Sequence, residues 1–213
     1  MPSREPPEIQ AITNWLAARE PGVETARAHA FLAEILAWND RLRLVSKREP
    51  AAVLTRLVQR SVALWRAVGE GAGAPASAVD LGAGGGFPGV VWKLIAPAVH
   101  LLLIERSERK AVFLERVTAR LGLEGVEVFA GDAREAARLP RHQAAYDGAV
   151  AMAVGRPADV GPVVAPLVRA GGWYATVGPV APIPPARLEG AWRLRRTWPL
   201  DEAVIVLYAR DDL

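Results

Sequence analysis

Residues 79–89 form a glycine-rich stretch, Val79-Asp80-Leu81-Gly82-Ala83-Gly84-Gly85-Gly86-Phe87-Pro88-Gly89. The stretch follows a short apolar run, Ala78–Leu81, and leads into a segment with helical periodicity, approximately Phe87–Ala96. Glycines between a strand and a helix let the backbone turn tightly, and they let a ligand lie against main-chain atoms without meeting a Cβ. We therefore expect a ligand-binding turn at the carboxyl end of the first strand of an α/β sheet.

Short apolar runs alternate with amphipathic helical segments after this turn. The runs are Leu101–Glu105, Val126–Ala130, Gly148–Met152 and Trp173–Val177, and the helical segments are approximately Ser107–Leu121, Ala133–Leu139 and Pro157–Val168. Strands that alternate with helices are joined by crossover connections, which predicts a parallel, doubly wound sheet. Two final runs, Trp192–Trp198 and Ala203–Ala209, are joined through Pro199–Glu202 and predict an antiparallel hairpin at the sheet edge.

The part of the chain before the glycine-rich stretch has a different pattern. Residues 7–70 carry apolar side chains at helical spacing, and Pro50 marks a restart of the pattern. Gly69–Ser77 is rich in Gly and Ala and is predicted to be a linker. We therefore expect an N-terminal helical extension, residues 1–70, packed on a ligand-binding domain, residues 71–213. Four tryptophans at helical spacing are expected to be core residues, namely Trp15, Trp38, Trp65 and Trp92.

The composition excludes several classes of site. The chain has no cysteine, which rules out disulfides and thiolate metal sites, and its three histidines lack the spacing of metal ligands. No apolar run reaches the roughly 18 residues of a membrane helix. The first residues, Met1–Pro7, have no apolar segment typical of a secretory leader. We expect a cytoplasmic protein with neither a metal nor a membrane partner.

Basic residues are concentrated before the glycine-rich stretch. The window from Arg41 to Arg66 holds seven basic residues and one acid, Glu49, although the net charge of the whole chain is only +3. Such a patch is suited to phosphate contacts with a nucleic acid. A solvated helix face beside a basic loop is the alternative interpretation.

Acidic residues stand at the ends of the first three predicted strands. Asp80 can accept a hydrogen bond from a cationic amine, directly or through water, and Glu105 can accept from both hydroxyls of a ribose. Asp132 lies where the adenine of a bound nucleoside would be. A dinucleotide-binding fold is the alternative, but the glycines match the pyrophosphate fingerprint only loosely and begin too late after the strand. An acid before the glycines also suits an ammonium group better than a phosphate.

Two segments together, Asp80–Gly89 and Leu103–Leu114, resemble the bacterial guanine-N7 methyltransferases of 16S ribosomal RNA, the glucose-inhibited division protein B family. The distinctive feature is Phe87-Pro88-Gly89 directly after the glycines, and the basic pair Arg109-Lys110 is a second family mark. The resemblance extends from about Trp38 to about Gly178. It implies a class I methyltransferase fold, Rossmann-like, in which a C-terminal antiparallel hairpin completes the sheet.

The resemblance also implies a cofactor, a partner and a set of site residues. The cofactor is S-adenosyl-L-methionine, and the partner is ribosomal RNA or the small ribosomal subunit. The implied cofactor-binding residues are Asp80, Gly82, Gly84, Phe87, Glu105, Asp132, Ala133 and Arg134. The expected RNA-binding residues are Arg41, Arg43, Lys47, Arg48, Arg56, Arg60, Arg109 and Lys110. We assign no catalytic residue, because guanine N7 has a free lone pair and needs no base to remove a proton.

The chain departs from the family at positions that border the cofactor and the RNA-facing side of the pocket. Where the family commonly has R-H-x-x-D-S, N-L-T and S-R-A, this chain has Arg56–Ser61, Arg43–Val45 and Ala151–Ala153, and Val177 replaces a lysine. Leu57, Arg60 and Met152 are the altered side chains in the first and third motifs. Two alternatives therefore stay open: a methyltransferase with another substrate, and a cofactor-binding regulator that no longer catalyses.

Overall fold

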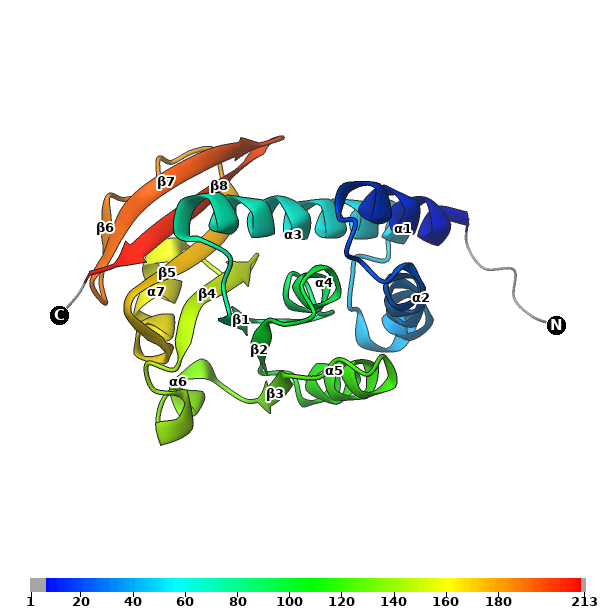
Figure 1. Cartoon of the computed structure of the whole chain (residues 1–213), viewed down its shortest axis with the longest axis horizontal. Coiled ribbons are helices and arrows are strands. Elements are labelled where there is room, and N and C mark those ends of the chain that lie inside the picture. Colours follow the sequence, from blue (N-terminus) through cyan, green and yellow to red (C-terminus); the bar gives the residue numbers. More distant parts are fainter. Residues whose placement is uncertain (1–6, 212–213) are drawn as a thin grey trace.

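The computed structural model describes residues 7–211 as an α/β protein with one eight-stranded sheet (Figure 1). The strands lie in the order β3-β2-β1-β4-β5-β8-β7-β6, parallel from β3 to β5 and antiparallel beyond. Their bounds are β1 Ser77–Leu81, β2 His100–Glu105, β3 Val126–Ala130, β4 Tyr146–Met152, β5 Val168–Pro179, β6 Arg187–Leu188, β7 Trp192–Leu200 and β8 Ala203–Arg210. The predicted doubly wound sheet is confirmed.

The helices are α1 Pro7–Arg19, α2 Thr25–Leu42, α3 Pro50–Ala72, α4 Gly89–Ile95, α5 Glu108–Arg120, α6 Ala133–Ala136 and α7 Pro157–Val164, with 3₁₀ turns at Pro140–His142 and Ala165–Leu167. Side chains that alternate along the strands face two separate cores. Leu101, Leu103 and Val150 face a core with α1 to α5, while Leu102 and Ala149 face a core with α6 and α7. The sheet is therefore covered by helices on both faces.

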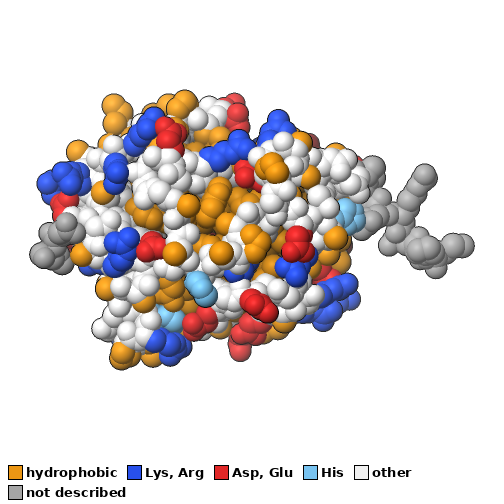
Figure 2. All heavy atoms as spheres, viewed as in Figure 1, with side chains coloured by type: hydrophobic (Ala, Val, Ile, Leu, Met, Phe, Trp, Pro, Cys, Tyr) orange, Lys and Arg blue, Asp and Glu red, His pale blue; other side chains and the backbone are white. Residues whose placement is uncertain are grey.

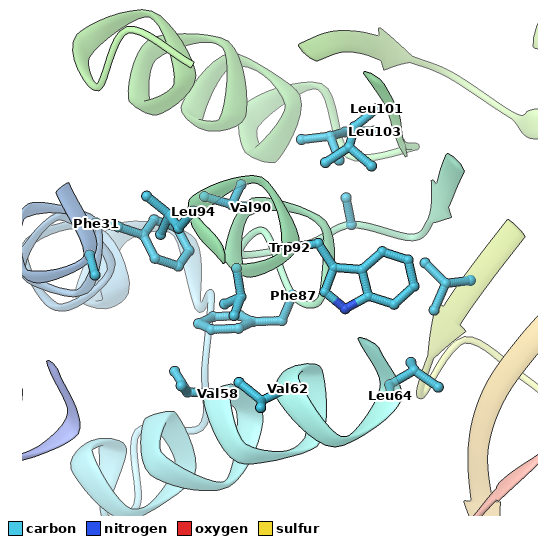
Figure 3. Close-up of a cluster of buried hydrophobic side chains, with 14 of the residues drawn as sticks. Phe31, Val58, Val62, Leu64, Phe87, Val90, Trp92, Leu94, Leu101 and Leu103 are labelled. Atoms are coloured by element: carbon cyan, nitrogen blue, oxygen red, sulfur yellow. The ribbon is translucent and has the colours of Figure 1, made fainter. Parts of the chain in front are cut away.

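The N-terminal helices and the sheet share one hydrophobic core. Figure 3 shows Phe31 of α2 and Val58 of α3 on two sides of α4, with Phe87 between α4 and α3 and with Trp92 extending from α4 toward the strands. Trp92 is fully buried and donates its indole N–H to the carbonyl oxygen of Ser61 in α3, 2.9 Å away. Trp15, Trp38 and Trp65 are only partly buried, although they pack against this core as predicted.

The linker was predicted too early. Helix α3 continues through Gly69 and Gly71 to Ala72 and ends at Gly73. A Cβ on Gly71 would come within 2.4 Å of Leu207 Cδ2 and 2.8 Å of Trp198 Cη2, so the helix needs a residue without a side chain to lie this close to β8 and β7. The glycine that resembles a helix breaker is thus a packing residue.

The C-terminal hairpin was predicted correctly but is not the edge of the sheet. Strand β8 pairs with β5, β7 pairs with β8, and the two-residue strand β6 is added outside β7. Two residues are too few to produce a pattern in the sequence.

No helix within residues 7–211 is both long and apolar enough to cross a membrane. The segment Met1–Pro7, on which the expectation about a leader rests, lies almost entirely outside the described residues.

The face seen in Figure 2 has no field of a single charge sign. Basic and acidic side chains are interspersed around its outline, and hydrophobic side chains lie between them. Several of the basic side chains in the molecule are neutralised by neighbours, as in the pair of Arg169 with Asp147 at 3.0 Å. The RNA-binding surface that the sequence predicts would therefore depend on local groupings of basic residues rather than on the overall charge.

Candidate functional site

The glycine-rich turn is fixed to the end of β2 by backbone and carboxylate hydrogen bonds. The N–H groups of Gly82 and Ala83 donate to the carbonyl oxygen of Ile104, at 2.8 and 3.1 Å. Glu105 accepts from the N–H of Gly84 at 2.9 Å through one oxygen and from the N–H of Ser107 at 2.7 Å through the other. The turn therefore has one defined position beside the carboxyl ends of β1 and β2.

Asp80 lies beneath this turn rather than in an open cavity. Its side chain is fully buried, and one carboxylate oxygen accepts from the N–H of Gly89 at 2.8 Å, while the other has no hydrogen-bond partner among the described residues. Burial raises the pKa of Asp80 to about 7; the Gly89 N–H partly opposes this and the charge of Glu105 adds to it. The carboxylate lies beneath α4 and the turn and supports the turn from below, and its predicted hydrogen bond to a cationic amine, directly or through water, stays a prediction.

The larger of two adjoining cavities opens at the carboxyl ends of β1, β2 and β3. It has a volume of about 440 Å³. Glu105 and Asp132 line it, and Asp132 also caps α6 by accepting from the N–H of Arg134 at 2.8 Å. The size lies in the range of small-molecule sites, and carboxylates at two strand ends are suited to hydroxyl and amine groups.

The second cavity, of about 310 Å³, shares Gly82 and Ala153 with the first. Its wall is largely apolar and includes Leu44, Leu57, Phe87, Met152 and Val177. Only two charged side chains line it, the half-buried Arg60 and Lys110, and no hydrogen bond or ion pair joins either side chain to another described residue. Four of the positions at which this chain departs from the family pattern, Leu57, Arg60, Met152 and Val177, thus line one cavity.

The predicted cofactor residues fall into three groups. Gly82, Glu105, Asp132, Ala133 and Arg134 line the larger cavity, Gly84 and Phe87 line the second, and Asp80 lines neither. The sequence analysis missed the opposite wall of the larger cavity, which follows β4 and includes Ala153, Val154, Gly155 and Asp159. The adjacency of β1 and β4, where the strand order reverses, is the signal that could have revealed this wall.

The predicted RNA-binding residues lie around the end of α2, the start of α3 and the start of α5. Arg60 and Lys110 line the second cavity, and Arg109 donates to the carbonyl oxygen of Arg41 at 3.0 Å, which joins α5 to α2. Lys47 pairs with Asp40 at 3.2 Å. Arg43, Arg48 and Arg56 are exposed.

The loop between α2 and α3 reaches the glycine-rich turn. A Cβ on Gly85 would lie 3.4 Å from the Cβ of Leu44, so this part of the basic segment is in contact with the turn. Arg66, at the far end of the basic segment, instead pairs with Glu20 at 2.9 Å and is held against α1. The charge excess in the sequence is therefore only partly available near the cavities.

A comparison with known protein families gives one match over most of the chain. The family described as rRNA small subunit methyltransferase G matches residues 24–178. Curated relatives named ribosomal RNA small subunit methyltransferase G include proteins of Roseiflexus castenholzii, 34% identical over 68% of this chain and 60% of the relative, and of Symbiobacterium thermophilum, 32% identical over 76% and 67%. The chain spans only about 60% of the length of the Roseiflexus relative.

Solved structures with the same fold are more distant in sequence. The Escherichia coli methyltransferase yhhF has a TM-score of 0.56 at 18% identity, covering 73% of this chain and 86% of its own. An S-adenosylmethionine-dependent methyltransferase of Aquifex aeolicus has a TM-score of 0.53 at 14% identity, covering 84% and 97%. The class I methyltransferase fold that the sequence resemblance implied is confirmed. With the family match over residues 24–178, the chain belongs to the rRNA small subunit methyltransferase G family.

Proposed function

We propose that this protein transfers a methyl group from S-adenosyl-L-methionine to N7 of a guanine in 16S ribosomal RNA, in the cytoplasm. The observation that carries the proposal is the pair of cavities that meet at Gly82 and Ala153. One has the volume and the carboxylates that a nucleoside with an amino-acid end requires. The other cavity has a largely apolar wall and two cationic side chains without an ion-pair partner. This combination suits a base attached to a phosphate backbone.

The residues of the larger cavity fit the cofactor. Glu105 and Asp132 would accept hydrogen bonds from its hydroxyl and amine groups, since each carboxylate oxygen can accept more than the one backbone bond it has. Gly82 would let the ligand approach the main chain, because this residue places no side chain at the point where the two cavities meet. When bound, the cofactor supplies an activated methyl group on a sulfonium.

The protein's contribution to the reaction would be positioning. Walls shared by two cavities hold the acceptor against the donor, and a contact near 3 Å between reacting atoms is roughly what a displacement needs. Guanine N7 has a free lone pair, so no side chain has to remove a proton before the methyl group is transferred. Arg60 and Lys110 would orient the nucleotide through its phosphate, because cations without a carboxylate partner are available for an anion.

The apolar side chains Leu57, Met152 and Val177 favour a second candidate function. They leave the second cavity with few hydrogen-bonding groups, which would also suit a methyltransferase with a different acceptor or a cofactor-binding regulator without activity. Mass-spectrometric mapping of 16S rRNA methylation in a strain without the gene, and in the same strain with the gene restored, separates these functions. A guanine N7 mark that disappears and returns supports the proposal, while an unchanged methylation pattern contradicts it.

Glu105 is expected to contribute strongly to cofactor affinity. Glu105→Ala removes a charged acceptor from the larger cavity and also frees the N–H groups of Gly84 and Ser107. We expect a loss of about 1.5–3 kcal/mol, or tenfold or more in affinity, measured by calorimetry with S-adenosylmethionine. Glu108→Ala, an exposed acid outside this cavity, is the control and should bind like the parent. Undiminished binding by a folded Glu105→Ala protein would exclude this role.

The exposed basic segment is expected to contact RNA phosphates. Changing Arg43 and Arg48 together to Ala should lower RNA affinity and flatten the plot of log affinity against log salt by about one to two units, since each phosphate contact adds roughly 0.7–0.9 to the slope. Cofactor affinity should not change, because neither side chain lines the larger cavity. Arg195→Ala, an exposed arginine on β7, is the matched control. Identical salt curves for parent and double variant would favour a solvated face instead.

A further inference from the structure

A groove of about 370 Å³ lies between α2 and α5, outside both cavities described above. Its floor is apolar and is formed by Leu42, Val112 and Phe113. Val112 is 57% exposed, which is unusual for a valine on an otherwise amphipathic helix. Trp38 and three arginines, Arg41, Arg109 and Arg116, surround this floor.

Two of these arginines bring uncompensated charge to the groove. The guanidinium carbons of Arg116 and Arg41 lie 5.1 and 5.6 Å from the centre of the Trp38 ring. Among residues 7–211 no carboxylate lies within ion-pair distance of either arginine. Two like charges at one indole repel each other, so an anion that contacts their N–H groups would stabilise the arrangement.

The acidic groups near the groove do not supply that anion. Glu34 accepts from the indole N–H of Trp38 at 3.0 Å and pairs with Arg120. Glu108 lines the groove but forms no ion pair with a described residue. Arg109 is bound to the carbonyl oxygen of Arg41, which orders the junction between the two helices. The N–H donors of Arg41 and Arg116 therefore remain available to a ligand.

The groove directly adjoins the second cavity along the chain. Arg109 and Leu42 line the groove, whereas Lys110 and Leu44, one and two residues further on, line the cavity. The backbone at residues 42–44 and 109–110 thus connects the two sites, and a polynucleotide bound at both would span this α2–α5 junction. The combination of an apolar floor with unpaired guanidinium groups matches a base and its phosphate.

We propose that this groove binds an unpaired nucleotide that flanks the methylated one, an inference that rests on the proposed RNA substrate. The base lies on the apolar floor at Val112, and the phosphate contacts the N–H groups of Arg41 and Arg116. The groove thereby selects RNA in which the target is in a single-stranded or opened region, because a base within a duplex cannot reach the floor.

Binding of fluorescently labelled oligoadenylate tests the proposal with one variant that should weaken the binding and one that should tighten it. Arg41→Ala with Arg116→Ala should weaken binding and flatten the salt dependence by about 0.7, the value for one phosphate of a single strand. Val112→Trp should tighten binding about fivefold or more, because it adds a stacking surface at an exposed position. Circular dichroism verifies that both variants are folded, so that misfolding explains neither the loss nor the gain.

Two other polyanionic ligands and one control variant distinguish a nucleotide site from a general anion site or an acidic-protein site. Val112→Trp should leave the binding of inorganic polyphosphate and of poly-L-glutamate unchanged, and Arg195→Ala should leave oligoadenylate binding unchanged. An equal gain for polyglutamate would identify an acidic-protein site, and no change for oligoadenylate in either groove variant would also overturn the proposal. Because S-adenosylmethionine binding and rRNA methylation are measured separately on the same proteins, a failure of the groove is distinct from a failure of the proposed function.

Discussion

Gly82→Val is expected to lower the affinity for S-adenosylmethionine by roughly a hundredfold or more, which corresponds to about 3 kcal/mol. Gly82 has a φ of +72° and lines both cavities. A β-branched residue in this left-handed conformation is strained by about 1–2 kcal/mol or more. Its Cβ would also come within 2.6 Å of Val154 Cγ2, and its methyl groups would enter the space where the two cavities adjoin.

Gly155→Ala is the matched control for this variant. Gly155 also lines the larger cavity, but its φ is not positive and a Cβ there would have its nearest neighbour, Val160 Cγ2, at 3.6 Å. Gly155→Ala should therefore retain most of the affinity. Calorimetry on both proteins, with circular dichroism to verify folding, gives the comparison. Unchanged affinity in Gly82→Val would show that the cofactor does not occupy the meeting point of the cavities.

Asp80→Asn is expected to remove a large pH dependence of stability. The native pKa of Asp80 is raised to about 7, so between about pH 4 and pH 7 the native protein holds a proton that the unfolded chain releases. Stability falls with pH wherever the native state binds more protons, and three pH units correspond to a loss of about 4 kcal/mol that is complete above pH 7. Asparagine stays neutral and can still accept from the Gly89 N–H, so the variant should not lose this stability.

Denaturant unfolding of parent and Asp80→Asn between pH 4 and pH 8 measures this difference. Asp147→Asn is expected to change the pH dependence of stability in the opposite direction. Burial alone would raise the pKa of Asp147, but the N–H groups of Ser77 and Ala76 and the Arg169 guanidinium hold it below its usual value. The parent therefore has stability from Asp147 at neutral pH that is lost as the pH falls through the lowered pKa. Parallel curves for parent and Asp80→Asn would contradict a neutral Asp80.

The sequence was sufficient to predict the parallel half of the sheet. Buried parallel strands appear as short apolar runs, and each of the five predicted runs lies within an observed strand. Gly71 was misinterpreted because a glycine has the same local signature whether it ends a helix or allows close packing, and only the position of Leu207 and Trp198 distinguishes the two. Strand β6 depends entirely on its pairing with β7 and has no signature of its own.

Site residues that follow the end of a strand could be predicted from the sequence. Whether such a residue is open to a cavity or buried in the folded protein could not. Glu105 and Asp132 line the larger cavity because parallel strands end at one edge. Asp80 occupies an equivalent position in the sequence, but α4 covers it, and this covering is a property of the tertiary structure. Trp38 was expected to be a core residue, yet only part of its surface is buried and two guanidinium groups lie over its ring.

The shared core around α4 has a consequence for how this protein can evolve. Phe31 and Val58 from the N-terminal helices cover Phe87 and Val90, which belong to the glycine-rich turn and its helix (Figure 3). A recombination event that exchanged the first seventy residues for unrelated helices would leave Trp92 and its neighbours in water, at a cost of roughly 1.5–3 kcal/mol for each large apolar side chain. The N-terminal helices and the glycine-rich turn are therefore expected to be inherited as one piece. Under the proposed function, a change of acceptor would arise by point substitution in the second cavity, at positions such as Leu57, Met152 and Val177, rather than by exchange of the N-terminal helices.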